Sequence, residues 1–271
     1  MEMLRRNDKE EFDSQGFLVF DPGLGPDVID QAYNDLIDLY PPEGTPDDNM
    51  GGKVAMRNAR RIQDAWRISP SVKQIATAPR VLQVLRDLYG RKPLPFQTLN
   101  FKVGSEQRTH SDTVHFNSRP AGLMCGVWVA LEDVDMESGP VMYYPGSHKW
   151  EEVALPEVDA FQARGNLAKA LAPLKTRFRY ARETNADYLV YENVIQDRVD
   201  RAGVKPVYAT IKKGQAFIWA ANLLHGGSHQ RDRARTRMSQ VTHYFFEGCR
   251  YYTPLLQRGP FTRWRTPQWI A

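Results

Sequence analysis

Hydrophobic and polar residues follow a helical period in the first ninety residues. In the segments 25–42 and 69–90, apolar side chains recur every three to four positions, as in amphipathic helices. Pro26 stands near the start of the first segment, and Gly90 ends the second, where glycine commonly caps a helix. We therefore predict that this part of the chain is mostly helical.

After residue 92 the pattern changes to short runs of β-branched and aromatic residues, separated by glycine and proline. Such runs predict β-strands joined by turns. Helices first and strands afterwards favour an all-β core with an N-terminal helical layer. The runs with this pattern are 95–103, 122–134, 139–148, 206–229 and 235–246.

We predict that the 271 residues form one domain, because a β-rich chain of this length with 42% hydrophobic residues buries one sizeable core. Residues 1–92 form the mainly helical layer, 93–150 and 206–250 supply the core strands, and 151–205 form a helical insertion. The insertion and the polar, Gly/Pro-rich segment 41–56 are both expected to cover the functional site as lids.

The charge of the chain adds little about its partners. The net charge is +4 and the pI about 9.0, too small an excess to predict nucleic-acid binding unless the basic residues share one face. Basic residues without acids gather in 160–182, and acids follow in 183–200. A phosphate-bearing or carboxylate substrate such as an acyl-CoA would suit this run, but we favour a solvated insertion.

Cysteine usage and hydropathy suggest a compartment. Cys125 and Cys249 are the two cysteines, and their spacing fits neither a metal knuckle nor a disulfide framework, so a reducing compartment is expected. The longest apolar runs are well short of a membrane span, and the first residues lack the apolar region of a secretory signal. We therefore expect a cytoplasmic protein that contacts neither membrane nor nucleic acid.

One short segment concentrates candidate metal ligands. Residues 109–116, "THSDTVHF", contain His110, Asp112 and His115. In a regular strand successive side chains point to opposite faces, so His110 and Asp112 share one face and His115 lies on the other. A lone His-x-Asp pair also occurs as an ordinary strand-edge hydrogen bond, so a metal site needs a third ligand from elsewhere.

His225 is the favoured third ligand. It ends the apolar run "AFIWAANLLH" just before Gly226-Gly227, so we expect it at a strand tip, on the rim of a core pocket. Two histidines and one carboxylate leave three adjacent metal positions open, as in Fe(II) oxygen chemistry, whereas structural zinc fills all four of its positions. The other candidates are His148, His229 and His243.

An arginine is expected to share this pocket. The run "TRMSQVTHYFF" returns beside His225 as a hairpin strand, with Arg237 pointing inward and Ser239 next on the same face. A buried guanidinium needs a partner, and its fork matches a carboxylate. A dianion that chelates the metal and reaches this arginine, such as 2-oxoglutarate, satisfies both charges. Arg235 is the alternative inward residue, and a wholly solvated hairpin would leave every arginine outside.

In their order along the chain, these motifs resemble the phytanoyl-CoA dioxygenase (PhyH) family of Fe(II)/2-oxoglutarate oxygenases. The resemblance rests on "HSD", "GVWVALEDVDMESGPVMYYPGSHK", "LLHGG" and an arginine twelve residues after that histidine. It extends from about Gly16 to Phe246. It implies a mainly β fold, a double-stranded β-helix or jelly roll of cupin type, with N-terminal helices packed on one sheet and a helical insertion.

The resemblance also implies roles for individual residues. His110, Asp112 and His225 would bind iron, and Arg237 would hold the distal carboxylate of 2-oxoglutarate. The residues implied to line the cosubstrate pocket are Trp128, Ser239, Thr98 and Asn100.

The implied reaction consumes 2-oxoglutarate and O₂ and releases succinate and CO₂, while a C–H bond of a small-molecule substrate is oxidised. Related halogenases replace the carboxylate ligand with a small residue, so the presence of Asp112 favours hydroxylation. Desaturation, epoxidation or cyclisation by the same iron chemistry are alternatives. So are a non-catalytic metal-binding jelly roll and a zinc-dependent hydrolase with His115 as its general base.

Two histidines depart from the metal-ligand set. His115 stands where members of the family usually have an aromatic residue, so we interpret it as a packing or supporting residue, with a substrate contact as the alternative. His148 belongs to the turn motif "PGSHK", and we interpret it as structural.

Overall fold

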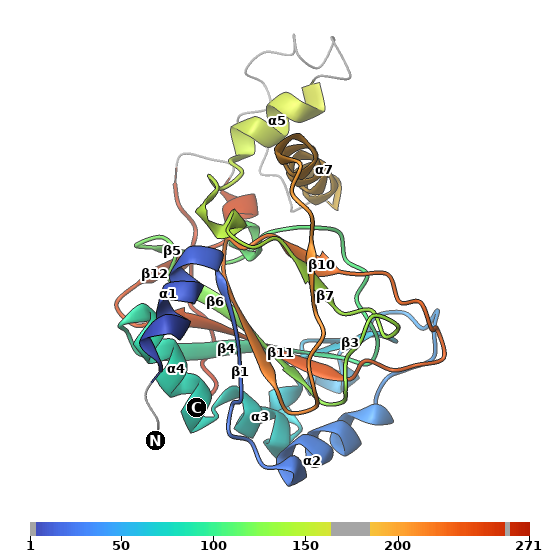
Figure 1. Cartoon of the computed structure of the whole chain (residues 1–271). Coiled ribbons are helices and arrows are strands. Elements are labelled where there is room, and N and C mark those ends of the chain that lie inside the picture. The colour runs from blue at the N-terminus through green and yellow to red at the C-terminus, as the bar shows by residue number, and fades with distance from the viewer. Residues whose placement is uncertain (1–3, 164–184, 258–260) are drawn as a thin grey trace.

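Antiparallel strands fill the centre of the molecule in a computed structural model, which describes residues 4–163, 185–257 and 261–271 (Figure 1). Most of these strands are short, and the long ones lie side by side in one sheet. The strands are β1 (Phe17–Phe20), β2 (Met56–Arg57), β3 (Arg61–Gln63), β4 (Pro93–Phe101), β5 (Asn117–Arg119), β6 (Met124–Ala130), β7 (Val141–Tyr143), β8 (Val207–Ala209), β9 (Ala216–Ala220), β10 (His225–Gly227), β11 (Ser239–Phe246), β12 (Arg250–Tyr252) and β13 (Trp264–Arg265).

The main sheet has seven strands in the order β1-β9-β6-β11-β4-β3-β2. Strands β10, β7 and β8 form a second sheet, and β13, β12 and β5 form a third. Trp128, Phe217 and Val241 of the main sheet pack in one buried cluster with Tyr143 and Ala209 of the second sheet. The core therefore lies between two sheets, and the predicted jelly-roll fold is confirmed.

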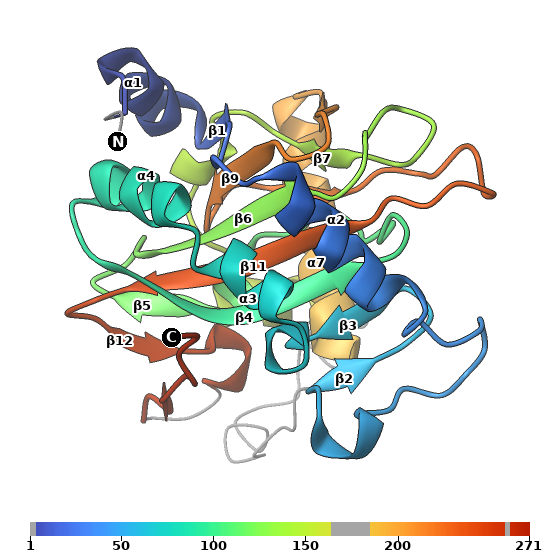
Figure 2. The ribbon, with the colours of Figure 1, turned by 90° about the horizontal axis from the view of Figure 1, so that it is seen from below.

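Helices cover the outer face of the main sheet, as Figure 2 shows from below. Ile29, Val72 and Val84 of these helices pack against Val127 and Ile218 of the sheet. This layer closes one side of the sheet and leaves the other side to the functional cavity. The α-helices in the described part of the chain are α1 (Arg6–Gln15), α2 (Pro26–Ile37), α3 (Pro70–Ala76), α4 (Pro79–Tyr89), α5 (Leu155–Ala163) and α7 (Asn185–Ala202).

The segment 69–90 forms two helices, α3 and α4. The break falls before Pro79, because proline lacks an N–H donor and restricts the preceding residue to extended conformations. Gly90 ends α4 in the left-handed region, with φ 66°, as predicted for a helix cap. None of the described helices is long and apolar enough to cross a membrane.

The insertion places α5 and α7 together at one end of the sandwich (Figure 1). Tyr191 and Ile195 of α7 pack in a buried cluster with Val114 and Leu224, which follow and precede two of the predicted metal ligands. Helix α7 therefore lies against the segment that carries the candidate site. From residue 164 onward, the basic run 160–182 lies outside the described residues.

Candidate metal centre

Two of the three predicted ligands are joined by their main chains. The N–H of His110 donates to the carbonyl of His225 and the N–H of His225 donates to the carbonyl of His110, both at 2.9 Å. Asp112 follows in a short 3-10 helix, Asp112–Val114, and its N–H donates to the carbonyl of Ala221 at 3.1 Å. The chain thus anchors the "HSD" segment directly onto the end of β9 and the start of β10.

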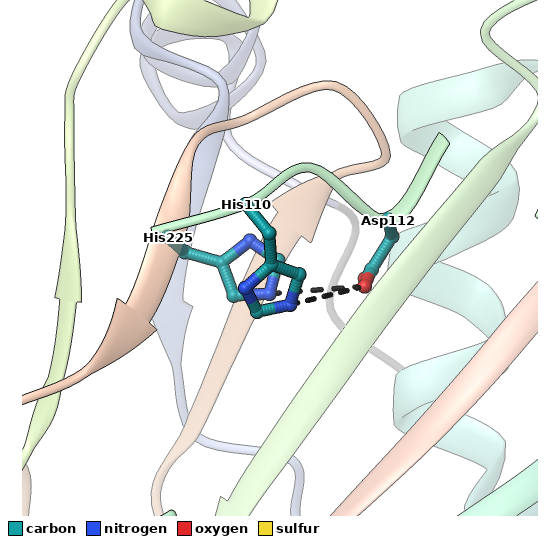
Figure 3. A group of neighbouring side chains, drawn as sticks. All are labelled: His110, Asp112 and His225. Carbon is teal, nitrogen blue, oxygen red and sulfur yellow. Dashed lines mark ion pairs between the residues drawn. The ribbon is translucent and has the colours of Figure 1, made fainter. Parts of the chain in front are cut away.

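The three side chains converge on one point (Figure 3). Nε2 of His110 lies 3.8 Å from Oδ1 of Asp112, and Nε2 of His225 lies 3.9 Å from the same oxygen. All three side chains are buried and their ligand atoms lie within 4.8 Å of one another. Donors that each bind an ion at about 2.1 Å are roughly 3–4 Å apart, so this set fits one transition-metal ion.

Backbone carbonyls fix the orientation of both imidazoles. Nδ1 of His110 lies 2.8 Å from the carbonyl of Arg108, and Nδ1 of His225 lies 2.9 Å from that of Leu223. A carbonyl only accepts, so each Nδ1 carries the hydrogen and each Nε2 presents its lone pair. Burial and the neighbouring His225 lower the pKa of His110 to about 3, which keeps its ring neutral at pH 7.

Asp112 is held as a carboxylate by residues of the main sheet. Trp219 Nε1 donates to its Oδ2 at 2.8 Å, and Nε2 of His243 lies 3.7 Å from the same oxygen. Burial raises the pKa of the Asp112 carboxyl, but three neighbouring imidazoles and the indole hydrogen bond lower it more, to about 2. An ionised carboxylate is therefore ready to bind a cation.

Gly126 makes room for this arrangement. Its strand β6 lies between β9 and β11, and Gly126 pairs with Trp219 on one side and His243 on the other. A Cβ at this position would lie 2.2 Å from Cζ2 of Trp219. Only glycine therefore lets the indole lie across β6 and reach Asp112.

The ligands open onto a cavity of about 280 Å³ that also contains Arg237. The Arg237 side chain is 3% exposed, and its guanidinium carbon lies 5.2 Å from the ring of Trp128 and 5.9 Å from that of Phe101. Its Nε and Nη1 have no hydrogen-bond partner among the described residues, and neither has the indole N–H of Trp128. Buried donors of this kind are normally paired, so this end of the cavity suits an anion.

The structure shows which of the two candidate arginines, Arg235 or Arg237, points into the cavity. Arg235 lies outside the cavity, where its Nη1 contacts both carboxylate oxygens of Asp135 at 2.8 and 2.9 Å. Arg237 lies inside, because its N–H pairs with the carbonyl of Lys102 and brings its side chain onto the cavity face. Of the two, Arg237 therefore has the position expected for the anion-binding residue.

Two expectations about the pocket lining need correction. Thr98 and Asn100 alternate along β4 with Gln97, Leu99 and Phe101, and it is the latter three that line the cavity. Thr98 and Asn100 instead face the helical layer, because side chains of a strand alternate between faces.

The second correction concerns Ser239 and the face assigned to His115. Ser239 is fully buried beneath the cavity, and its hydroxyl donates to the carbonyl of Arg237. His115 lines the cavity, although the alternation of a regular strand predicted the opposite face, because the 3-10 helix interrupts the strand. His148 and His229 lie outside this cavity. Nε2 of His148 lies 3.3 Å from the carbonyl of Asp13, and Nδ1 of His229 lies 2.9 Å from the carboxylate of Glu106.

Two tyrosines of α7 support residues of the site and gave no signal in the sequence. The Tyr191 hydroxyl accepts from the N–H of Ser111 at 3.0 Å, so α7 braces the residue between two ligands. The ring of Tyr188 lies 4.9 Å from that of His115. These residues come from an insertion without a motif, so only the packing of α7 identifies them.

Comparisons with known proteins agree with this site. A protein from Danio rerio, described as phytanoyl-CoA dioxygenase domain-containing protein 1, is 35% identical over 83 residues, 29% of this chain and 28% of that protein. A probable phytanoyl-CoA dioxygenase from Caenorhabditis elegans is 28% identical over 99 residues, 33% of this chain and 31% of the relative. The matched stretches thus span less than a third of either relative.

Solved structures share the fold. EctD from S. alaskensis with 2-oxoglutarate and 5-hydroxyectoine is 17% identical, with a TM-score of 0.64 over 98% of this chain and 85% of that one. The α-ketoglutarate-dependent carbocyclase SnoK from nogalamycin biosynthesis is 14% identical, with a TM-score of 0.62 over 92% and 86%. The model of the family described as phytanoyl-CoA dioxygenase (PhyH) matches residues 12–238. This match covers most of the chain, so the protein belongs to the phytanoyl-CoA dioxygenase family.

Proposed function

We propose that the protein is an Fe(II)- and 2-oxoglutarate-dependent dioxygenase that hydroxylates a C–H bond of a small molecule and releases succinate and CO₂. One observation carries the proposal: a two-histidine, one-carboxylate set and a buried arginine without a hydrogen-bond partner among the described residues share one cavity. The first suits a metal with open positions, and the second suits the far end of a dicarboxylate.

His110, Asp112 and His225 would hold the iron. When bound, the iron with 2-oxoglutarate and O₂ supplies the oxidising chemistry, which no protein side chain offers. The chain contributes orientation: two carbonyls direct the imidazole lone pairs, and Trp219 keeps the carboxylate in place. Burial of all three ligands limits the access of water to the reacting atoms.

Arg237 and Trp128 would bind 2-oxoglutarate. Two nitrogens of the guanidinium, Nε and Nη1, and the indole nitrogen of Trp128 have no partner among the described residues, and all are buried and close together. A carboxylate accepts several such hydrogen bonds at once, and a charge-assisted pair in a buried site is among the stronger polar contacts. Burial lowers the pKa of Arg237 to about 10, which still leaves it charged at pH 7 to meet an anion.

Hydroxylation is the proposed outcome because the aspartate ligand is present, in contrast to related halogenases. The solved structures of similar fold include proteins titled carbocyclase and epimerase, so the same scaffold accommodates other outcomes in those proteins. The mass of the product distinguishes them: hydroxylation or epoxidation adds one oxygen, whereas desaturation or cyclisation removes two hydrogens.

The test is anaerobic and needs no substrate. Fe(II) and 2-oxoglutarate added together to the protein should produce a visible charge-transfer band, and Zn(II) with 2-oxoglutarate should produce none. On admission of air, 2-oxoglutarate should be converted to succinate. A protein that forms no band and makes no succinate would instead be a metal-binding jelly roll or a zinc-dependent hydrolase.

A further inference from the structure

A second arginine, Arg61, lines the same cavity from the edge of the main sheet. It lies on β3, where it pairs across the strands with Phe101, and Gln63 follows on the same face. In the described part of the chain, no carboxylate oxygen lies within 4.0 Å of its guanidinium, and its side chain forms no hydrogen bond there. The proposed iron and cosubstrate sites make no use of this residue.

The position of Arg61 separates it from the 2-oxoglutarate site. Strand β4 lies between β11, which follows Arg237, and β3, which carries Arg61. Burial lowers the pKa of Arg61, while the nearby Asp47 and Tyr188 act in the opposite direction, and Tyr188 belongs to α7. Arg61 therefore lies on the side of the cavity near α7, two strands away from the strand that follows Arg237.

Among the groups that line the cavity, positive charge exceeds negative charge once iron and 2-oxoglutarate are counted. Its permanently charged lining residues are Arg61, Arg237 and Asp112. A divalent iron and the two arginines exceed, by one positive charge, the aspartate together with the two carboxylates of 2-oxoglutarate. Burial lowers the pKa of both arginines, and Asp47 and Glu132 raise the pKa of Arg61 and Arg237 respectively from outside the cavity lining. A second ligand with one negative charge would pair with the excess charge directly, inside the cavity.

Groups that can form hydrogen bonds line the cavity together with Arg61. Gln63 and Gln97 of the sheet and Gln107 and His115 of the opposite wall all line the cavity. The three amides bind polar groups of a substrate without adding charge, so the charge that selects a substrate on this side comes from Arg61.

We infer that the substrate is a small carboxylic acid, bound as a monoanion whose carboxylate pairs with Arg61 while the rest of the molecule extends toward the metal. The inference rests on the proposed function and adds the substrate class to it. The charge count favours a carboxylate over a phosphate monoester, because a dianion would change the excess of one positive charge into an excess of one negative charge.

The experiment uses the anaerobic protein with Fe(II) and 2-oxoglutarate, followed by its visible band. Hexanoate, benzoate and N-acetylphenylalanine are each titrated against the matching primary amide. The acids should shift the band at concentrations about tenfold or more below those of the amides, as expected for a charge-assisted hydrogen bond. A phosphate monoester, phenyl phosphate, should bind more weakly than benzoate.

Variants assign the preference to one residue. Arg61→Gln should bring each acid and its amide to similar affinity, and Arg61→Lys should keep part of the preference. The matched control is Arg60→Gln, because the neighbouring Arg60 is 41% exposed and pairs with Glu43 and Glu106. This control should keep the full preference.

Three results would overturn the inference: no preference for the acids, an equal preference in Arg61→Gln, or loss of the band on adding the acids, which means displacement of 2-oxoglutarate. A rise of the 2-oxoglutarate Kd in Arg61→Gln as large as that in Arg237→Gln would also overturn it, because Arg61 would then bind the cosubstrate. In each case the band of the probe-free protein still tests the proposed function separately.

Discussion

The cavity has two polar ends. At the metal end, the candidate ligands His110, Asp112 and His225 are all hydrogen-bonded within the protein, whereas at the Arg237 end three buried nitrogen donors have no partner among the described residues. The polar side chains at both ends are buried. The two ends differ in whether the protein itself satisfies those polar groups.

This difference teaches how the two sites are expected to respond to their ligands. The metal end is preorganised, so an ion meets donors that are already oriented. The arginine end carries an uncompensated cost of burial, which a bound anion removes. Ligand binding should therefore change stability mainly through Arg237, and side-chain changes should separate the two ends.

Asp112→Ala is expected to have the largest effect, because it removes the single anionic ligand from the metal end. The visible band with Fe(II) and 2-oxoglutarate should disappear, and succinate formation should fall at least about 1,000-fold. The control is Asp133→Ala, a 59% exposed carboxylate paired with Lys212. A normal band in Asp112→Ala would place the metal elsewhere.

Arg237→Gln should act on the other end. The Kd for 2-oxoglutarate should rise by about 10- to 100-fold, since a hydrogen bond to a charged group contributes roughly 1.5–3 kcal/mol. Anaerobic titration of the visible band measures it. The matched control is Arg235→Gln, two residues away and paired with Asp135 at the surface. A larger rise in the control than in Arg237→Gln would transfer the role to Arg235.

Trp219→Phe tests whether orientation matters at the metal end. The change removes the N–H that donates to Asp112 and keeps most of the ring in its place above Gly126. Loss of such a supporting hydrogen bond typically weakens metal binding by about 10-fold or more. Competition with a chelator measures the Fe(II) affinity, and an unchanged value would show that the aspartate needs no support.

Trp128→Phe is the corresponding change at the arginine end, and its effect should be smaller. It removes one unpaired N–H beside Arg237, so the 2-oxoglutarate Kd should rise by roughly 3- to 10-fold, the value of one hydrogen bond. Fe(II) affinity should follow the wild type. If each tryptophan variant affected both ligands alike, the two ends would not be separate sites.

Arg237→Met tests the cost of burying the guanidinium in the ligand-free protein. Replacement of a buried, unpaired guanidinium by an apolar side chain should stabilise the apoprotein, by about 1 kcal/mol or more. Thermal unfolding without metal or 2-oxoglutarate measures this change, expected as a Tm rise of about 2–4 °C. Saturating 2-oxoglutarate should then stabilise the wild type and not the variant. A destabilised apoprotein would mean that the guanidinium is compensated in the absence of ligand.

The sequence singled out the three side chains that converge in the structure because they belong to short motifs. His110 and Asp112 are two residues apart, and His225 ends a recognisable apolar run. Short sequence patterns are therefore enough to identify them as candidate ligands. The sequence also predicted Arg237 as an inward residue, because the hairpin that carries it has a regular return strand.

The contacts that support these residues could not be predicted in the same way. Trp219, Gly126 and His243 become neighbours only because β9, β6 and β11 are adjacent in the sheet, and no local pattern states strand order. The side assigned to His115 failed for a related reason, since a 3-10 helix replaced the regular strand on which the alternation rule depends. Thr98 is misassigned by one step along β4, which reverses the face of a strand residue.

The main-chain pairing of His110 with His225 means that peptide groups, rather than imidazoles, close this corner of the fold. Shortening either side chain therefore leaves its Cα in position and vacates a slot that matches one imidazole ring. Free imidazole from solution matches the space left by the missing ring, so an added small molecule can take the place of the histidine side chain as a metal ligand. The fold then becomes a starting point for artificial metalloenzymes with exchangeable ligands.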